Sequence, residues 1–184
     1  MRLFVAVEVS QAVRDAIAAL LPELEATAAH SRFVKPEKMH LTLQFLGSVD
    51  PTRVEAIGSA LQTAAAGQGT VSLSFKAGGS FGSARSPRVL WVGVEGEVPK
   101  LIALQQRIAK HLEPLGFPPE TRPYSPHLTL ARARNVRGDR QLRACVEKLA
   151  TFSVPGEQVS RVVLMESVQD SAGGRYRVVE AVQL

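Results

Sequence analysis

Residues 40–43 of the chain read His-Leu-Thr-Leu, and residues 127–130 repeat the same four amino acids. The surrounding pattern predicts a β-strand at each place, over 38–46 and over 127–133. On a strand, residues i and i+2 share a face. Each histidine therefore shares a face with its threonine, while the leucines face a core. The sequence thus predicts two equivalent His-Thr units, one in each half of the chain.

Hydrophobic periodicity divides the rest of the chain into alternating strands and helices. Further strands are predicted at 2–9, 70–77, 89–94, 158–168 and 174–183. Helices are predicted at about 10–29, from Asp50-Pro51 to Gly67 or Gly69, at about 98–114 and at about 139–151. Pro22 is expected to kink or shorten the first helix. Residues 78–88 and 115–126 are predicted to be irregular, and DSAGG at 170–174 to form a hairpin turn.

The predicted order of elements is β-α-β-α-β-β-α-β-α-β-β. Strands joined by short turns occur beside strands separated by helices, which favours an α+β fold with mixed or antiparallel sheets over a doubly wound parallel sheet. A length of 184 residues suits one domain, or two small lobes that share a core.

Several features of the sequence indicate the cellular compartment in which we expect the protein. The chain lacks the ~18 consecutive apolar residues of a membrane span. Glu8 interrupts the apolar opening segment and no cleavage site follows it, so we interpret that segment as a strand and expect a cytoplasmic protein. Cys145 is the only cysteine, which excludes an internal disulfide, and its apolar neighbours predict a buried thiol rather than a nucleophile.

The net charge is +5, and arginine carries most of the positive charge. Six arginines fall within 22 residues around the second tetrad: Arg122, Arg132, Arg134, Arg137, Arg140 and Arg143. Arginine binds phosphate through two parallel hydrogen bonds, so this density favours a phosphate-bearing partner. A solubilising surface would account for the same charge.

The two His-Thr units suit displacement at phosphorus. Such a reaction needs a base for the attacking oxygen and an acid for the leaving oxygen, and two histidines can supply both near neutral pH. Threonine hydroxyls can donate to the non-bridging oxygens. We therefore predict His40 and His127 as catalytic residues and Thr42 and Thr129 as phosphate-binding residues, provided that the two halves meet in one cleft.

Other chemistries fit the sequence less well. Two histidines without a carboxylate or thiolate at ligand spacing are too few for zinc, so no metal is predicted. The glycine-rich segment at 79–88 matches neither a Walker loop nor a dinucleotide fingerprint, so no cofactor is predicted either. The remaining histidines, His30 and His111, lie near predicted helix ends and suit ordinary surface positions.

Two residues are candidates for RNA binding. Strict alternation places Arg132 on the face opposite His127, although a bulge or twist would return it to the cleft rim, and a salt-bridged surface arginine is equally consistent. Tyr124, in the irregular segment before the second tetrad, could stack on a base. Phe45 falls on the apolar face of its strand, which predicts a core position rather than a stacking platform.

The chain resembles the RNA 2′,3′-cyclic phosphodiesterases, also called 2′-5′ RNA ligases, of the 2H phosphoesterase superfamily. The resemblance runs nearly end to end and rests on four segments: MRLFVAVEV, PEKMHLTLQFLGSVD, GSFGSARSPRVLWVGV and ETRPYSPHLTLAR. It implies one domain over 1–184, made of two pseudo-symmetric lobes with helix-flanked sheets and an active-site cleft between them. Phe33 departs from the tryptophan of many relatives but keeps an aromatic ring.

The resemblance also implies an activity: hydrolysis of a 3′-terminal 2′,3′-cyclic phosphate of RNA to a 2′-phosphate. His40 would donate a proton to the leaving 3′ oxygen, and His127 would activate water. The same groups could run backwards as an ATP-independent 2′-5′ ligation. The expected partner is RNA with such an end, tRNA fragments included, bound by a monomer that uses no metal or membrane. Two alternatives stay open: a phosphodiesterase for small cyclic nucleotides, and a non-catalytic module that binds RNA ends.

Overall fold

The computed structural model describes residues 1–169 and 174–184. Its strands in this part of the chain are β1 (Arg2–Glu8), β2 (Ser31–Phe33), β3 (His40–Ser48), β4 (Val71–Gly82), β5 (Pro87–Gly96), β6 (His127–Ala133), β7 (Ser153–Val159), β8 (Arg161–Val168) and β9 (Arg175–Gln183). They form sheet A, in the order β3-β1-β8-β9, and sheet B, in the order β2-β6-β5-β4-β7. All the described strand pairs are antiparallel.

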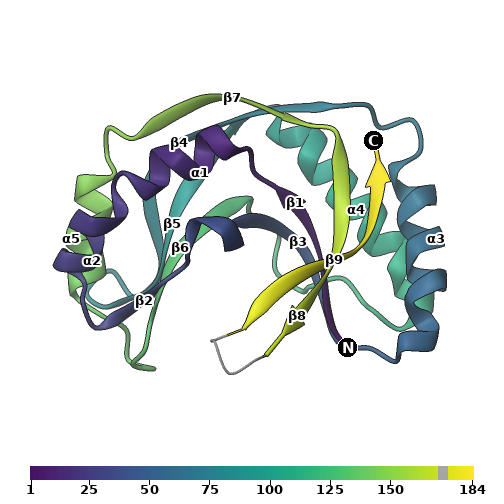
Figure 1. Cartoon of the computed structure of the whole chain (residues 1–184), viewed down its shortest axis with the longest axis horizontal. Helices are drawn as coiled ribbons and strands as arrows, with labels where there is room; N and C mark the ends of the chain where they lie inside the picture. Colours follow the sequence, from purple (N-terminus) through teal and green to yellow (C-terminus); the bar gives the residue numbers. More distant parts are fainter. Residues whose placement is uncertain (170–173) are drawn as a thin grey trace.

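Helices cover the outer side of each sheet (Figure 1). They are α1 (Gln11–Ala18), α2 (Leu21–Thr27), α3 (Val54–Ala65), α4 (Val98–Leu112) and α5 (Gln141–Lys148), with short 3₁₀ turns η1 (Pro36–Lys38), η2 (Pro51–Arg53) and η3 (Glu113–Leu115). Helices α3 and α4 pack on sheet A and form lobe A with it, while α1, α2 and α5 pack on sheet B and form lobe B. The predicted α+β fold with two antiparallel sheets is confirmed.

The leucines of both tetrads lie in one hydrophobic core. Leu41, Leu43, Leu128 and Leu130 are all buried and belong to the same cluster, which extends through both lobes. Each buried leucine side chain contributes about 1.5–3 kcal/mol by leaving water. This burial anchors both tetrad strands and orients their polar residues away from the core, as the strand phase predicts.

Each tetrad strand contains a β-bulge at the same place. Pairing of β1 with β3 passes from Ala6–Thr42 to Val5–Gln44, and pairing of β5 with β6 passes from Trp91–Thr129 to Leu90–Ala131. Leu43 and Leu130 are therefore the extra residues, and the alternation of faces restarts after them. The next residue on the histidine face is consequently Phe45 in β3 and Arg132 in β6.

These bulges correct two expectations. The prediction that Phe45 is a core residue is wrong, because its side chain is 58% exposed. The strict alternation that placed Arg132 opposite His127 is also wrong, since one inserted residue reverses the side on which every later residue lies.

Two predicted boundaries are wrong as well. Residues 78–88 are mostly strand, because β4 continues to Gly82 and β5 begins at Pro87. Glycine and serine disfavour strands locally, but long-range pairing overrides that preference. Gly79 is needed there, since a Cβ atom would lie 2.0 Å from the Trp91 ring. The single strand predicted over 158–168 is in fact the end of β7 followed by β8, and the prediction left out the start of β7, where Pro155 and Gly156 interrupt the alternation at a sheet edge. The predicted turn at 170–174 falls largely outside the described residues.

Each lobe takes strands from both halves of the chain. Sheet A combines β1 and β3 with β8 and β9, and sheet B contains β2 as well as β6 and β7. The backbone carbonyl of each inserted leucine also binds a residue from the other half of the chain. The carbonyl oxygen of Leu43 accepts a hydrogen bond from Gln105 Nε2 at 3.4 Å, and that of Leu130 accepts one from the Val34 amide at 2.8 Å.

We propose that residues 1–184 form a single cooperative domain, because neither half of the chain can complete a lobe alone. Calorimetric unfolding is expected to show one transition, with equal calorimetric and van't Hoff enthalpies. Two resolved transitions would contradict this proposal.

Candidate functional site

The two His-Thr units meet where the sheets approach each other. Strand β3 is an edge strand of sheet A and contacts β6 of sheet B. Two adjoining pockets open there, one of about 450 Å³ that His40 lines and one of about 690 Å³ that His127 lines. Both pockets share four residues: Thr42, Phe45, Thr129 and Arg132. The structure thus brings all four predicted catalytic and phosphate-binding residues to one cleft.

The two imidazoles have the same hydrogen-bond geometry. Nδ1 of His40 lies 2.8 Å from the carbonyl oxygen of Lys38, and Nδ1 of His127 lies 2.7 Å from that of Ser125. A carbonyl oxygen only accepts, so Nδ1 carries the hydrogen and donates it. The other ring nitrogen, Nε2, is therefore unprotonated in the neutral ring and can accept a proton, which the resulting imidazolium can then deliver.

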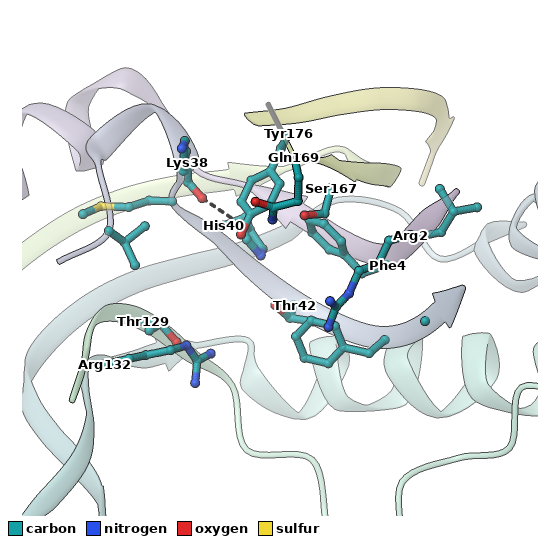
Figure 2. Close-up of a pocket in the computed structure, with 15 residues that line it drawn as sticks. Arg2, Phe4, Lys38, His40, Thr42, Thr129, Arg132, Ser167, Gln169 and Tyr176 are labelled. Carbon is teal, nitrogen blue, oxygen red and sulfur yellow. Dashed lines mark hydrogen bonds between the residues drawn. The ribbon is translucent and has the colours of Figure 1, made fainter. Parts of the chain in front are cut away.

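Aromatic rings hold both imidazoles in place. The His40 ring lies 4.9 Å from the Phe4 ring and 5.2 Å, edge to face, from the Tyr176 ring (Figure 2). The His127 ring lies 4.8 Å, also edge to face, from Phe81. Of these aromatic neighbours, only Phe4 could have been suspected from the sequence, because the alternation of β1 places it on the face opposite the main hydrophobic core. The others depend on pairings between distant strands.

Burial lowers the pKa of both histidines. Loss of solvent is the largest cause in each case, the backbone hydrogen bond partly opposes it, and the positive charge of Arg132 lowers both pKa values further. In both cases the neutral imidazole is therefore favoured relative to a solvent-exposed histidine. Since one guanidinium acts on both rings, it lies within electrostatic range of both.

Arg132 is positioned to bind an anion. Its guanidinium extends from β6 into the pocket, across from His40 and Thr42 (Figure 2). It makes no hydrogen bond or ion pair with any other residue that the structure describes, so the interpretation of a salt-bridged surface arginine is wrong. A guanidinium without a partner can form two parallel hydrogen bonds to a phosphate.

The stacking candidates differ from the sequence-based expectation. Phe45 is exposed and lines both pockets. Tyr124 lines only the larger one and packs against the core. Its hydroxyl is buried without a partner among the described residues, and burial raises its pKa. The geometry therefore favours Phe45, which sequence alternation placed in the core.

Other features lie away from this site. Within residues 1–169 and 174–184, no group of three or more His, Cys, Asp or Glu side chains is arranged to hold a metal ion. No helix of this part of the chain has the length and apolarity to cross a membrane. Cys145 is buried as predicted, and burial raises the pKa of its thiol to about 11.

Comparison with known proteins explains the internal repetition. The family model described as "LigT like Phosphoesterase" matches the chain twice, over residues 7–91 and 92–176, and each match contains one tetrad and its bulge. The chain belongs to the LigT-like phosphoesterase family. The predicted membership of the 2H phosphoesterases is thereby confirmed, as is the prediction that the chain is an enzyme.

Two relatives of this LigT-like phosphoesterase illustrate a match over nearly the whole length of both chains. A protein of Methanothermobacter thermautotrophicus named RNA 2′,3′-cyclic phosphodiesterase is 32% identical over 100% of this chain and 98% of its own length. One of the same name from Archaeoglobus fulgidus is 31% identical, over 96% and 97% respectively. Among solved structures, E. coli LigT complexed with 3′-AMP superposes with a TM-score of 0.77 at 23% identity, covering 100% of this chain and 97% of that one, which shows a shared fold.

Proposed function

We propose that this LigT-like phosphoesterase hydrolyses the 2′,3′-cyclic phosphate at the 3′ end of RNA to a 2′-phosphate. The observation that carries the proposal is the pair of imidazoles, each with Nε2 free, in adjoining pockets that share two threonines and an unpaired arginine. Relatives named for this activity, 31–32% identical over nearly the whole chain, support it.

In the proposed reaction, Thr42, Thr129 and Arg132 hold the phosphate oxygens. His127 Nε2 removes a proton from water as the water oxygen bonds to phosphorus. His40 enters the reaction protonated at both ring nitrogens, and as the bond from phosphorus to O3′ breaks, its Nε2 gives its proton to O3′. The product is a 2′-phosphate with a free 3′ hydroxyl, and proton exchange with solvent restores both histidines. Family resemblance alone supports this division into donor and acceptor.

The pockets suggest where the terminal nucleoside lies. O3′ belongs to that nucleoside, so the nucleoside lies on the side of the proton donor, His40. The pocket there is lined by Phe4, Phe45 and Tyr176. Of these rings, Phe45 is the most exposed. Stacking of a base on an exposed aromatic ring contributes about 1–3 kcal/mol, and we propose Phe45 for this role.

A second activity of the same site is 2′-5′ ligation. A water molecule occupies roughly 30 Å³, whereas the pocket beside His127 measures about 690 Å³. That space could admit the 5′ end of a second RNA strand, whose 5′ hydroxyl would attack in place of water. The bonds made and broken at phosphorus are otherwise unchanged, so no ATP is consumed.

The experiment is incubation of the protein in EDTA with an oligonucleotide that ends in a 2′,3′-cyclic phosphate, with and without a 5′-hydroxyl acceptor. The expected products are the 2′-phosphate and, with acceptor, a 2′-5′ linkage. A 3′-phosphate product would mean that O2′, and not O3′, is the leaving oxygen. Activity lost only in EDTA would indicate a metal. Binding without turnover would favour the RNA-end-binding module, and faster turnover of 3′,5′-cyclic nucleotides would favour the small-nucleotide alternative.

We also propose a cytoplasmic monomer acting on RNA fragments, those of tRNA among them. The net charge of +5 supports an RNA partner, and all the lining residues of the two pockets come from one chain, so the candidate site needs no second subunit. Light scattering would test the monomer, cell fractionation the compartment, and sequencing of cellular RNA with 2′-phosphate ends the substrates.

A further inference from the structure

Three arginines cluster at the edge of sheet B next to the candidate site. Arg32 of the edge strand β2 pairs directly with Arg132 of β6, and Arg134 follows the last residue of β6. Neighbouring strands lie about 4.8 Å apart, and residues i and i+2 of a strand about 6.8 Å apart. All three side chains are exposed. The arrangement concentrates positive charge on one small area that adjoins the pockets.

This arrangement is unfavourable without an anion. Like charges directly opposite each other on neighbouring strands destabilise a sheet, and here Arg32 faces Arg132. Two exposed arginines elsewhere do have acidic partners, since Arg161 binds Glu8 at 2.5 Å and Arg177 binds Glu166 at 2.6 Å.

No residue in the described part of the chain gives the three clustered arginines such a partner. The carboxylate of Asp139, near the start of β2, is already occupied. Its Oδ2 accepts a hydrogen bond from Ser31 Oγ at 2.7 Å, and its Oδ1 accepts one from the Gln141 amide at 2.9 Å. The three guanidinium groups are therefore free to bind phosphate.

The cluster continues the pocket beside His40. Val34, two residues after Arg32, lines that pocket together with Arg132. In the proposed reaction the terminal nucleoside occupies this pocket, and its 5′ phosphate connects it to the rest of the RNA. Besides the sides of the pocket lined by Arg2 and Lys38, one positively charged route out of it passes over β2 and the end of β6.

We propose that Arg32 and Arg134 bind the backbone phosphates of the RNA just 5′ of its terminal nucleotide, so that the strand leaves the site across the edge of sheet B. The inference rests on the proposed function and adds the path of the substrate to it. It makes the protein selective for oligonucleotides over a free nucleoside 2′,3′-cyclic phosphate, which has no upstream phosphate.

The test compares KM for two substrates, a nucleoside 2′,3′-cyclic phosphate and an oligonucleotide with the same end, across a salt series. Arg32→Gln and Arg134→Gln are each expected to raise KM for the oligonucleotide several-fold relative to the mononucleotide. Loss of one phosphate contact should also reduce the salt slope of log KM by about 0.7. The matched control is Arg143→Gln, which removes the same charge from α5 on the outer side of sheet B.

Each outcome separates this inference from the proposed function. If the wild type hydrolyses both substrates and the two variants match it in KM and salt slope, the strand takes another path. An equal rise in KM for both substrates, or the same slope change in Arg143→Gln, would also overturn the assignment. Failure of the wild type to hydrolyse either substrate would refute the proposed function itself.

Discussion

Replacing His40 or His127 with alanine is expected to lower kcat on RNA with a 2′,3′-cyclic end by about 10²–10⁴-fold, the usual contribution of general acid–base catalysis. Each variant removes one of the two Nε2 atoms that the hydrogen bonds from Nδ1 leave available. Steady-state kinetics in EDTA measures the loss. The double variant should be scarcely slower than the worse single variant, because residues that act as a unit are not additive.

The matched control for these variants is His30→Ala, which removes an exposed histidine outside both pockets and should leave kcat unchanged. Circular dichroism and thermal unfolding would establish that the His40 and His127 variants are folded. Activity within tenfold of the wild type in either folded variant would rule out the two-histidine mechanism.

Replacing Arg132 with alanine is expected to lower kcat/KM by about 10²–10³-fold, the range seen when a donor to developing negative charge is removed. The same variant should alter the pH profile. Limbs of kcat/KM report the pKa values of the free protein, and both histidine pKa values are lowered from 6.5. We therefore expect a bell-shaped wild-type profile with its maximum on the acid side of pH 6.5.

The direction of change in the variant follows from the sign of the charge. Arg132 disfavours protonation of both imidazoles, so removing it raises both pKa values and moves the maximum to higher pH. Arg132→Lys keeps the positive charge and should keep the maximum in place, while the lost bidentate contact still lowers kcat/KM. A lower rate with an unmoved profile in Arg132→Ala would show that the guanidinium does not act on the histidines.

Local patterns were sufficient to predict which side chains lie together at the centre of the candidate site. The phase of each tetrad strand placed His40 with Thr42 and His127 with Thr129, and buried leucines fixed that phase. Strand β6 was predicted with its observed bounds. The helix break near Pro22 also agrees with the structure, where α1 ends at Ala18 and α2 begins at Leu21. These features depend on residues that are close in sequence.

The parts that local patterns missed depend on distant partners. Nothing in HLTLQF or HLTLAR marks Leu43 or Leu130 as an inserted residue, since both are apolar and both become buried. The bulges appear only in the register with β1 and β5. For the same reason, the faces of Phe45 and Arg132 were not predictable. The ring contacts of Tyr176 and Phe81 with the histidines also arise from strand order, not from spacing.

The exchange of strands between the lobes limits how the cleft can move. A protein that closes on its ligand by domain rotation usually bends at a few hinge residues. Here the backbone crosses between the lobes repeatedly. It runs from β1 in lobe A to β2 in lobe B, back to β3 in lobe A and on to β4 in lobe B, and it crosses again from β7 in lobe B to β8 in lobe A. A rotation of one lobe would have to deform all of these connections together. We therefore expect the separation of the two imidazoles to change little when substrate binds.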